Sequence, residues 1–518
     1  MMARACSPPY ASNRWSPTHA HAARHAPPFP SENSMNPQTF PEPFSLAAVN
    51  PSRARHVPAY LWYLLAAALL LLAYRIGLMA LLPLADTTEA RYGEIARQAV
   101  SNGYWLMPHI DPQTPFFAKP PLSTWASAIS MEIFGINEFA ARLPALLASL
   151  LAVIVAMGFA REMKLRRSWL VAPVLAASPL FFLCAGAVMT DALQMVIIVA
   201  ALYFAWRTLN SIGDDAFKWR LAFWSMIGLG ALCKGLATWA LIGLPLIAYA
   251  LVERRPWQMF RHVFSWGGVA LALGIFMPWY IAAEYTNPGF LNYFIIGEHF
   301  SRFLVPGWKG DHYGIAQQQP MGAIWIFWSI GMLPWLGVFV SELLRFFSKR
   351  PKQSLAIERF LWCATLAPLL FFTFSRNIIW TYGLTAALPF SVLVARWLEN
   401  TSTKTQSRTG IAIALLALLA VMCGPYVVSK ASANSDRDLI QAFHRAAVPG
   451  MQLAYKVRPE YSSDYYARNA LHYEPDAVLN KNTHNELVVV DRNELAQQGI
   501  AADHILFVGK NRALIKPE

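Results

Sequence analysis

The stretch DTTEARYGEIARQAVSNGYWLMPHIDPQTPFFAKPP, residues 86–121, decides how this chain is organised. It follows a first long apolar run at about 60–84, and its charged residues make it too polar to cross a bilayer. A connecting segment of this length is uncommon unless it has a function of its own. We therefore expect it to form the rim of a site at the membrane surface, supported by the rest of the chain.

The rest of the chain has the composition of a multi-pass membrane protein. Of its 518 residues, 56% are hydrophobic and only 14% are charged, and the apolar residues come in blocks. The net charge of +13 comes largely from Lys and Arg in short loops between these blocks, as the positive-inside rule requires. This pattern argues against nucleic-acid binding and makes the lipid bilayer the expected environment.

The apolar blocks predict a mostly α-helical fold with about 11 membrane spans. We place these spans at about 60–84, 139–160, 169–186, 191–206, 221–234, 236–252, 264–283, 321–342, 359–375, 378–395 and 410–428. The basic loops then face the cytoplasm. The polar loops 86–138 and 284–320 face the opposite side, so we expect their charged residues to share one membrane face.

The two ends of the chain differ from the membrane region at 58–428. Residues 1–57 are rich in Pro, Ser, His and Ala, which predicts a disordered cytoplasmic tail. Residues 429–518 alternate short helical and strand patterns, which predict a small α/β domain outside the membrane. We expect its helices at 436–447 and 493–498 and its strands at 487–490, 505–508 and 513–515.

Three carboxylates on the expected outer side are candidates for acid–base chemistry. Asp86 and Glu89 follow the first apolar run, and Asp191 stands at a turn between two later runs. A carboxylate there can take a proton from an acceptor hydroxyl or orient that hydroxyl. The simpler explanation is helix capping, which uses the same residue types, and the sequence leaves both open.

Cations gather on the same side. Lys119 lies between Phe116-Phe117-Ala118 and Pro120-Pro121, where prolines fix the backbone and aromatic rings suit the lipid–water boundary. Arg302 lies three residues after His299, so one helix face would carry both side chains, and the imidazole offers a proton or a metal ligand. Lys234 precedes Gly235 at a turn, which is its simpler role. Cations and carboxylates at one membrane face indicate an anionic lipid-linked substrate, such as a polyprenyl phosphate sugar.

Several motifs in order resemble a known family. They are TEARYGEIA at 88–96, FAKPPL at 117–122, FGINEF at 134–139 and RLP at 142–144. This set, with Met189-Thr190-Asp191, Cys233-Lys234-Gly235, Glu298-His299 and Arg302, resembles the bacterial lipid A aminoarabinose transferases. It also resembles the wider protein mannosyltransferase-like group of membrane glycosyltransferases, which have the GT-C fold (glycosyltransferase family 83-like) with about 11–13 membrane helices. The resemblance covers about residues 60–518.

The resemblance implies transfer of a sugar from a polyprenyl (undecaprenyl) phosphate to lipid A or another envelope glycan. The site would face the periplasm from the bacterial inner membrane, with the C-terminal domain also periplasmic. By position, the donor phosphate would be held by Arg91, Lys119, Lys234 and Arg302. Asp191 would be a catalytic or acceptor-orienting acid, and His299 would help to hold a metal ion such as zinc.

Two positions depart from the family pattern. The family has an aspartate directly before the glutamate of its first motif, where this chain has Thr88, so either Asp86 or Glu89 is the candidate base. The family also has a glutamate before the lysine of its Lys-Pro motif. This chain has Ala118 there, so the metal site expected at His299 lacks one partner.

Two other functions remain open at this point. One keeps the fold and transfers the sugar to protein, as the protein O-mannosyltransferases do. The other is a non-catalytic flippase or transporter of lipid-linked glycans. A transporter would carry ionisable groups near mid-membrane on several spans, whereas here they gather at one rim.

Overall fold

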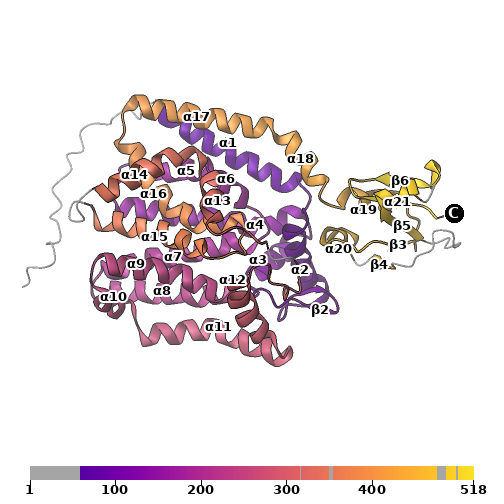
Figure 1. The fold of residues 1–518 in the computed structure, drawn as a ribbon, viewed down its shortest axis with the longest axis horizontal. Coiled ribbons are helices and arrows are strands. Elements are labelled where there is room, and N and C mark those ends of the chain that lie inside the picture. The colour runs from indigo at the N-terminus through magenta and orange to yellow at the C-terminus, as the bar shows by residue number, and fades with distance from the viewer. Residues whose placement is uncertain are drawn as a thin grey trace, which may run out of the picture. The chain divides into compact units, whose positions relative to one another are not determined.

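The computed structural model describes residues 59–314, 317–348, 354–468, 470–474, 486–497 and 500–517. The N-terminal tail predicted at 1–57 lies outside these residues. The described chain is mostly α-helical, with a two-stranded and a five-stranded sheet (Figure 1).

Six helices in the described residues are long and apolar enough to cross a membrane. They are α1 (Ala59–Leu81), α4 (Glu138–Glu162), α7 (Thr190–Leu209), α11 (Trp266–Thr286), α15 (Ala356–Thr373) and α17 (Thr403–Met422). A seventh span is possible if α13 (Ala323–Gly331) and α14 (Leu336–Ser348) are counted together, although this pair is bent by 89°. The chain is therefore a multi-pass membrane protein, as its composition predicts.

The other predicted spans are not among these six, because they are shorter, less apolar or broken. Three of them are α8 (Gly213–Lys234), α9 (Leu236–Val252) and α16 (Leu384–Asn400). The prediction of one continuous span at 169–186 is wrong, because this stretch divides into a short 3₁₀ turn, α5 (Val171–Ala176) and α6 (Pro179–Cys184). Pro179 lacks an N–H group, and the residue before it, Ser178, has extended backbone angles.

The helices pack around α7, which is buried along most of its length. Helices α4, α8, α9 and α16 all contact α7, and α15 packs on α9 and α16. The core between them is formed by small and branched apolar residues together with aromatic rings. The N-terminal end of α7 therefore opens at the meeting point of several helices.

The polar stretch forms α2 (Thr88–Asn102), a hairpin of β1 (His109–Asp111) and β2 (Thr114–Pro115), and α3 (Leu122–Phe134). The sequence pattern of α2 fits an amphipathic helix that lies along the membrane interface. Instead, α2 is packed against α3 and against α20 of the C-terminal region. Its polar residues Glu94 and Arg97 are buried and form an ion pair of 2.7 Å, which removes the need for a solvated face.

The C-terminal region is a small α/β unit, as predicted. Its five-stranded sheet has the order β4-β3-β5-β7-β6. Strand β3 runs parallel to β4 and β5, and β7 runs antiparallel to β5 and β6. The elements are α18 (Gly424–Ser432), α19 (Arg437–Ala446), β3 (Gln452–Tyr455), α20 (Tyr461–Ala467), β4 (Leu471–Tyr473), β5 (Glu486–Asp491), α21 (Arg492–Gln497), β6 (Ile505–Val508) and β7 (Arg512–Ile515).

Arg142, near the start of α4, fixes the polar stretch to the membrane helices. Its guanidinium group donates hydrogen bonds of 2.6–3.0 Å to the carbonyl oxygens of Met79, Leu82 and Pro83. Carbonyl groups at the end of a helix have no partner within that helix. It also forms a salt bridge of 2.7 Å with Glu89 of α2. The Glu89 carboxylate in turn accepts from the backbone N–H of Val188 at 3.0 Å, just before α7. One buried arginine thus joins α1, α2, α4 and the entry to α7.

We expect Arg142→Met to lower the stability of the protein by about 3–5 kcal/mol, because the half-buried Glu89 would lose its cation and three carbonyl groups would lose their donor. Thermal unfolding of the detergent-purified protein measures the effect. Arg161→Met is the matched control, since Arg161 lies on the same helix and is exposed. Equal melting temperatures for the two variants would contradict this role for Arg142.

Candidate active site

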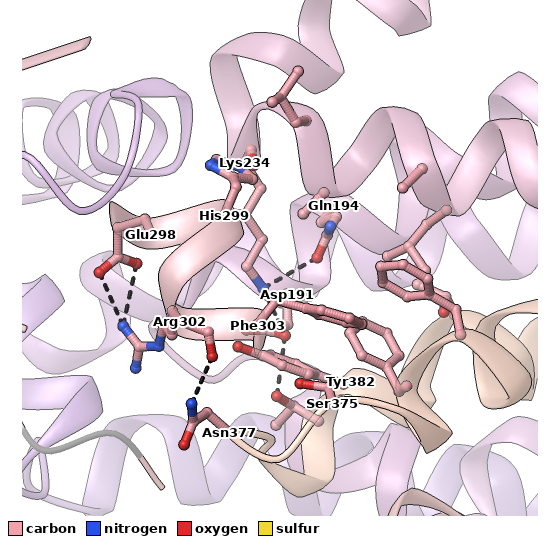
Figure 2. A pocket seen from close by; sticks show the side chains of 18 of the residues that line it. Asp191, Gln194, Lys234, Glu298, His299, Arg302, Phe303, Ser375, Asn377 and Tyr382 are labelled. Carbon is pink, nitrogen blue, oxygen red and sulfur yellow. Dashed lines mark hydrogen bonds and ion pairs between the residues drawn. The ribbon is translucent and has the colours of Figure 1, made fainter. Parts of the chain in front are cut away.

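A cavity of about 500 Å³ lies beside the N-terminal end of α7 (Figure 2). Its wall has a polar part and an apolar part. The polar part consists of Asp191, Gln194, Lys234, Glu298, His299, Arg302, Ser375, Asn377, Thr381, Tyr382 and Thr385. The apolar part consists of Leu236, Ala237, Ala240, Leu241, Phe300, Phe303, Leu304, Phe371, Phe372 and Leu384. Such a cavity suits a molecule with a charged head and a long apolar tail.

The turn between α8 and α9 brings Lys234 to this cavity. Gly235 follows it with a φ angle of +63°, which favours glycine. A side-chain carbon on Gly235 would stand 2.6 Å from the Phe294 ring, so the position also lacks space. The close approach lets the Lys234 carbonyl oxygen lie 3.1 Å from Nε2 of His299.

The loop between α11 and α13 supplies the other cationic side chain of the wall. Residues Asn292–Ser301 form a π-helix, a rare form that often marks functional sites. The spacing of three residues predicts that His299 and Arg302 share a helix face. The wider turn instead pairs Arg302 with Glu298, while His299 points towards the α8–α9 turn.

Asp191 is held by two donors inside the cavity wall. Lys234 Nζ lies 3.1 Å from its Oδ1, and the Thr381 hydroxyl donates to the same oxygen at 3.0 Å. Lys234 Nζ also donates to Gln194 Oε1 at 3.1 Å and lies 5.1 Å from the centre of the Tyr382 ring. Asp191 and Lys234 are both buried, so each provides the counter-charge that the other needs.

Glu298 is the centre of a second ionic group. Lys119 Nζ donates to its Oε2 at 2.6 Å, and one guanidinium nitrogen of Arg302 lies 3.0 and 3.1 Å from its two oxygens. The same nitrogen lies 3.2 Å from Asp311. Burial alone would raise the pKa of Glu298, but Lys119 and Arg302 hold that pKa below its ordinary value. Glu298 is therefore a carboxylate at neutral pH.

Each of the two ionic groups contains equal numbers of cations and carboxylates. Three cations, Lys119, Lys234 and Arg302, face three carboxylates, Asp191, Glu298 and Asp311. A bound phosphate would have to share these cations with the carboxylates that hold them now. Lys119 does not line the cavity itself but reaches it through Glu298.

Besides Lys119, three predicted site residues lie outside the cavity wall. Arg91 donates to the carbonyl oxygen of Tyr313 at 2.5 Å and is surrounded by aromatic rings. Glu89 is bound to Arg142, as described above. Asp86 accepts a hydrogen bond of 3.0 Å from the Ser462 N–H and another from the Ser462 hydroxyl, and so fixes α20 to the end of α1.

The surroundings of His299 do not fit the expected zinc ion. Its Nδ1 lies 2.7 Å from the carbonyl oxygen of Phe294, and its Nε2 faces the carbonyl oxygen of Lys234. Both ring nitrogens therefore face oxygen acceptors, and neither is turned towards an open position. Ala118 supplies no carboxylate, and burial lowers the pKa of His299.

Sequence reasoning did not identify several members of the site. Gln194, Thr381 and Tyr382 lie inside apolar stretches that carry no motif, and Asp311 lies in a loop without periodicity. Glu298 was noticed only as the neighbour of His299. The sequence did contain a signal for the pairing of Glu298 with Arg302, because an acid four residues before an arginine often forms an ion pair on a helix.

Comparisons with known proteins agree with this fold. Residues 118–281 match the family described as dolichyl-phosphate-mannose-protein mannosyltransferase. The undecaprenyl phosphate-alpha-4-amino-4-deoxy-L-arabinose arabinosyl transferase of Aeromonas hydrophila is 28% identical over 60% of this chain and 56% of its own length. The enzyme of that name from Pseudomonas aeruginosa is 29% identical over 68% of this chain and 64% of its own. The chain thus spans less than two thirds of these relatives.

The solved structures include one with the same fold over nearly its whole length. The crystal structure of ArnT from Cupriavidus metallidurans bound to undecaprenyl phosphate has a TM-score of 0.71 and 20% identity. The match covers 88% of this chain and 98% of that one. The predicted likeness to the aminoarabinose transferases, the membrane GT-C fold and the small C-terminal sheet region are therefore confirmed.

We expect Asp86 to make the stability of the protein depend on pH. Burial raises the pKa of Asp86 to about 7, although the hydrogen bonds from Ser462 oppose this rise. Between about pH 4 and 7 the folded protein keeps a proton there that the unfolded chain releases, so stability falls as the pH rises. Asp86→Asn cannot titrate and so lacks this loss of stability. From about pH 4.5 to 7.5, the melting temperature of the variant should fall by a few °C less than that of the wild type.

Asp464 provides a positive control, because burial raises its pKa to about 7 as well. Asp464→Asn should weaken the pH dependence in the same direction. Parallel curves for Asp86→Asn and the wild type would show that Asp86 does not titrate in this window.

Proposed function

We propose that this chain is an integral membrane glycosyltransferase that moves a sugar from an undecaprenyl phosphate donor to an acceptor at the periplasmic face of the bacterial inner membrane. The observation that carries the proposal is the cavity itself, in which buried ionic groups lie beside an apolar, partly exposed wall. The names of the relatives and the fold shared with ArnT support the same donor.

The donor's two parts fit the two parts of the cavity. The polyprenyl tail would lie along the apolar wall and leave it past Phe300 and Leu304, which are exposed and would face lipid. The phosphate would lie at Lys119 and Arg302, with Lys234 close by. Glu298 would then share both cations with the phosphate, which keeps them in position before the donor arrives.

The reaction needs charge stabilisation on one side and a carboxylate on the other. The bond between the anomeric carbon and the phosphate oxygen breaks, and an acceptor oxygen forms a new bond to that carbon. Undecaprenyl phosphate leaves with the electron pair, and Lys119 and Arg302 stabilise its negative charge. Asp191 orients the acceptor or takes its proton, and Lys234 and Thr381 hold the carboxylate in place.

Asp86, Glu89 and Arg91 receive supporting roles in this proposal. Asp86 and Glu89 bind the C-terminal region and Arg142, so Asp191 is the better candidate for the base. Arg91 packs behind the site, against Tyr313 and the rings around it. No step requires a metal ion.

The acceptor is a second part of the proposal. Lipid A or another envelope glycan fits the names of the relatives, which are aminoarabinose transferases. Transfer to protein is the alternative that the mannosyltransferase family match at 118–281 favours. Membranes incubated with a labelled donor would distinguish these functions. Label in lipid A or in protein identifies the acceptor, whereas label that remains on unchanged donor indicates a flippase.

We expect Lys119→Ala to reduce sugar transfer at least 100-fold, because the leaving phosphate loses a charge-assisted partner. Release of undecaprenyl phosphate from a labelled donor by the purified protein measures the rate. Lys309→Ala is the matched control, since Lys309 is an exposed lysine of the other polar loop, 284–320. Transfer at the wild-type rate would remove Lys119 from the phosphate site.

A double variant separates catalysis from structure. If Lys119 only neutralises Glu298, then Lys119→Ala combined with Glu298→Gln should recover activity, because no unpaired charge remains. If Lys119 binds the phosphate, the double variant stays inactive although it folds.

We expect Asp191→Asn to lower kcat by about 10²–10⁴-fold while the KM for the donor changes little, as for the loss of a general base. Steady-state kinetics with varied donor provide both constants. Thr381→Val removes only one hydrogen bond to Asp191 and should give a smaller loss. A wild-type kcat for Asp191→Asn would exclude this aspartate from the chemistry.

A further inference from the structure

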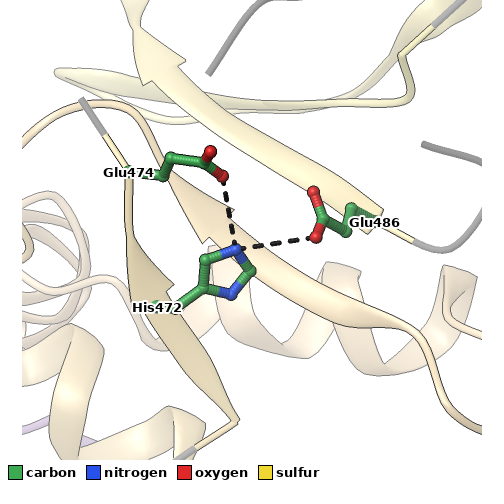
Figure 3. Close-up of side chains that lie close together, drawn as sticks. All are labelled: His472, Glu474 and Glu486. Atoms are coloured by element: carbon green, nitrogen blue, oxygen red, sulfur yellow. Dashed lines mark ion pairs between the residues drawn. The ribbon is translucent and has the colours of Figure 1, made fainter. Parts of the chain in front are cut away.

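Three side chains with metal-binding atoms converge in the C-terminal sheet, away from the groups that the proposed reaction uses. They are His472 and Glu474, at the end of β4, and Glu486, at the start of β5 (Figure 3). One ring nitrogen and two carboxylate oxygens lie within 4.8 Å of one another. We found no other group of this kind among the residues that the structure describes.

The register of the sheet explains why these side chains meet. His472 pairs with Ala454 of β3, and Ala454 pairs with Val488 of β5, so the three lie in one row across the sheet. Glu474 and Glu486 are each two positions from a member of this row, so they share its face. Ala454 lies between β4 and β5, and its small side chain leaves room for His472 and Glu486 to reach each other above it.

The contacts are too long for hydrogen bonds and suit an ion between them. The His472 Nε2 lies 3.8 Å from Glu474 Oε2 and 3.7 Å from Glu486 Oε1, whereas hydrogen bonds from nitrogen to oxygen are about 2.7–3.2 Å. Ligand atoms that bind one zinc ion at about 2.0–2.2 Å lie roughly 3.3–3.6 Å apart in a tetrahedral site. Small rotations of the two partly exposed glutamates would close the difference.

We propose that His472, Glu474 and Glu486 bind a divalent transition-metal ion of the zinc type. Imidazole nitrogen with two carboxylates is a ligand set that zinc accepts, and the exposed position leaves room for water to complete the coordination shell. An imidazole that binds a metal through its lone pair is uncharged, so this ligand set would carry two negative charges, which the ion would neutralise. The ion would tie the edge strand β4 to β5 across β3 and so stabilise the edge of the sheet.

Zinc binding by the full-length protein in detergent tests this site. The protein is treated with a chelator, incubated with zinc chloride, desalted and analysed for zinc by mass spectrometry. The chain has 12 histidines, so the readout is the difference between variants rather than the total. We expect the wild type to retain one zinc ion per chain more than His472→Ala, and Glu486→Gln to show the same loss.

His444→Ala is the matched control, because His444 is exposed on α19 of the same region. It should retain as much zinc as the wild type, and zinc should raise the melting temperature of both but not that of His472→Ala. Equal zinc content in the wild type, His472→Ala and Glu486→Gln would overturn the site. A similar loss in His444→Ala would show that the binding is not specific to these three residues.

Discussion

The buried salt bridge between Arg142 and Glu89 determines how the polar stretch is held against the membrane helices. It satisfies carbonyl groups at the end of α1 and reaches the backbone at the entry to α7. Asp191, the proposed catalytic carboxylate, stands in the first turn of α7, and Lys119 follows α2 in the polar stretch. This ionic contact therefore helps to set the distance between Lys119 and Asp191.

Hydropathy was sufficient to predict a multi-pass membrane protein, and the predicted spans placed Asp191, Lys234, His299 and Arg302 on one expected membrane face. The structure brings these four residues to one cavity. Hydropathy could not predict the pairings of Lys119 with Glu298 and of Lys234 with Asp191, because each pairing joins segments that are far apart in the sequence. The burial of α2 was missed for a related reason. An amphipathic pattern does not distinguish a helix at the lipid surface from one covered by a domain that folds over it.

Short strands and helix breaks were also difficult to predict from the sequence. Strands β3 and β4 have four and three residues, too few for an alternating pattern to stand out. The break at Pro179 was visible in the sequence but was overridden by the apolar run around it. Asp86 and Glu89 were candidate bases in the sequence, but they lie outside the cavity wall, and their contacts with Ser462 and Arg142 link parts of the chain that only the tertiary structure brings together.

The equal numbers of positive and negative groups around the cavity have a kinetic consequence. A site whose formal charges cancel has little long-range field, so it cannot attract a charged molecule from a distance. A lipid carrier would have to arrive by two-dimensional diffusion within its leaflet, and the encounter rate would depend on its surface density rather than on ionic strength.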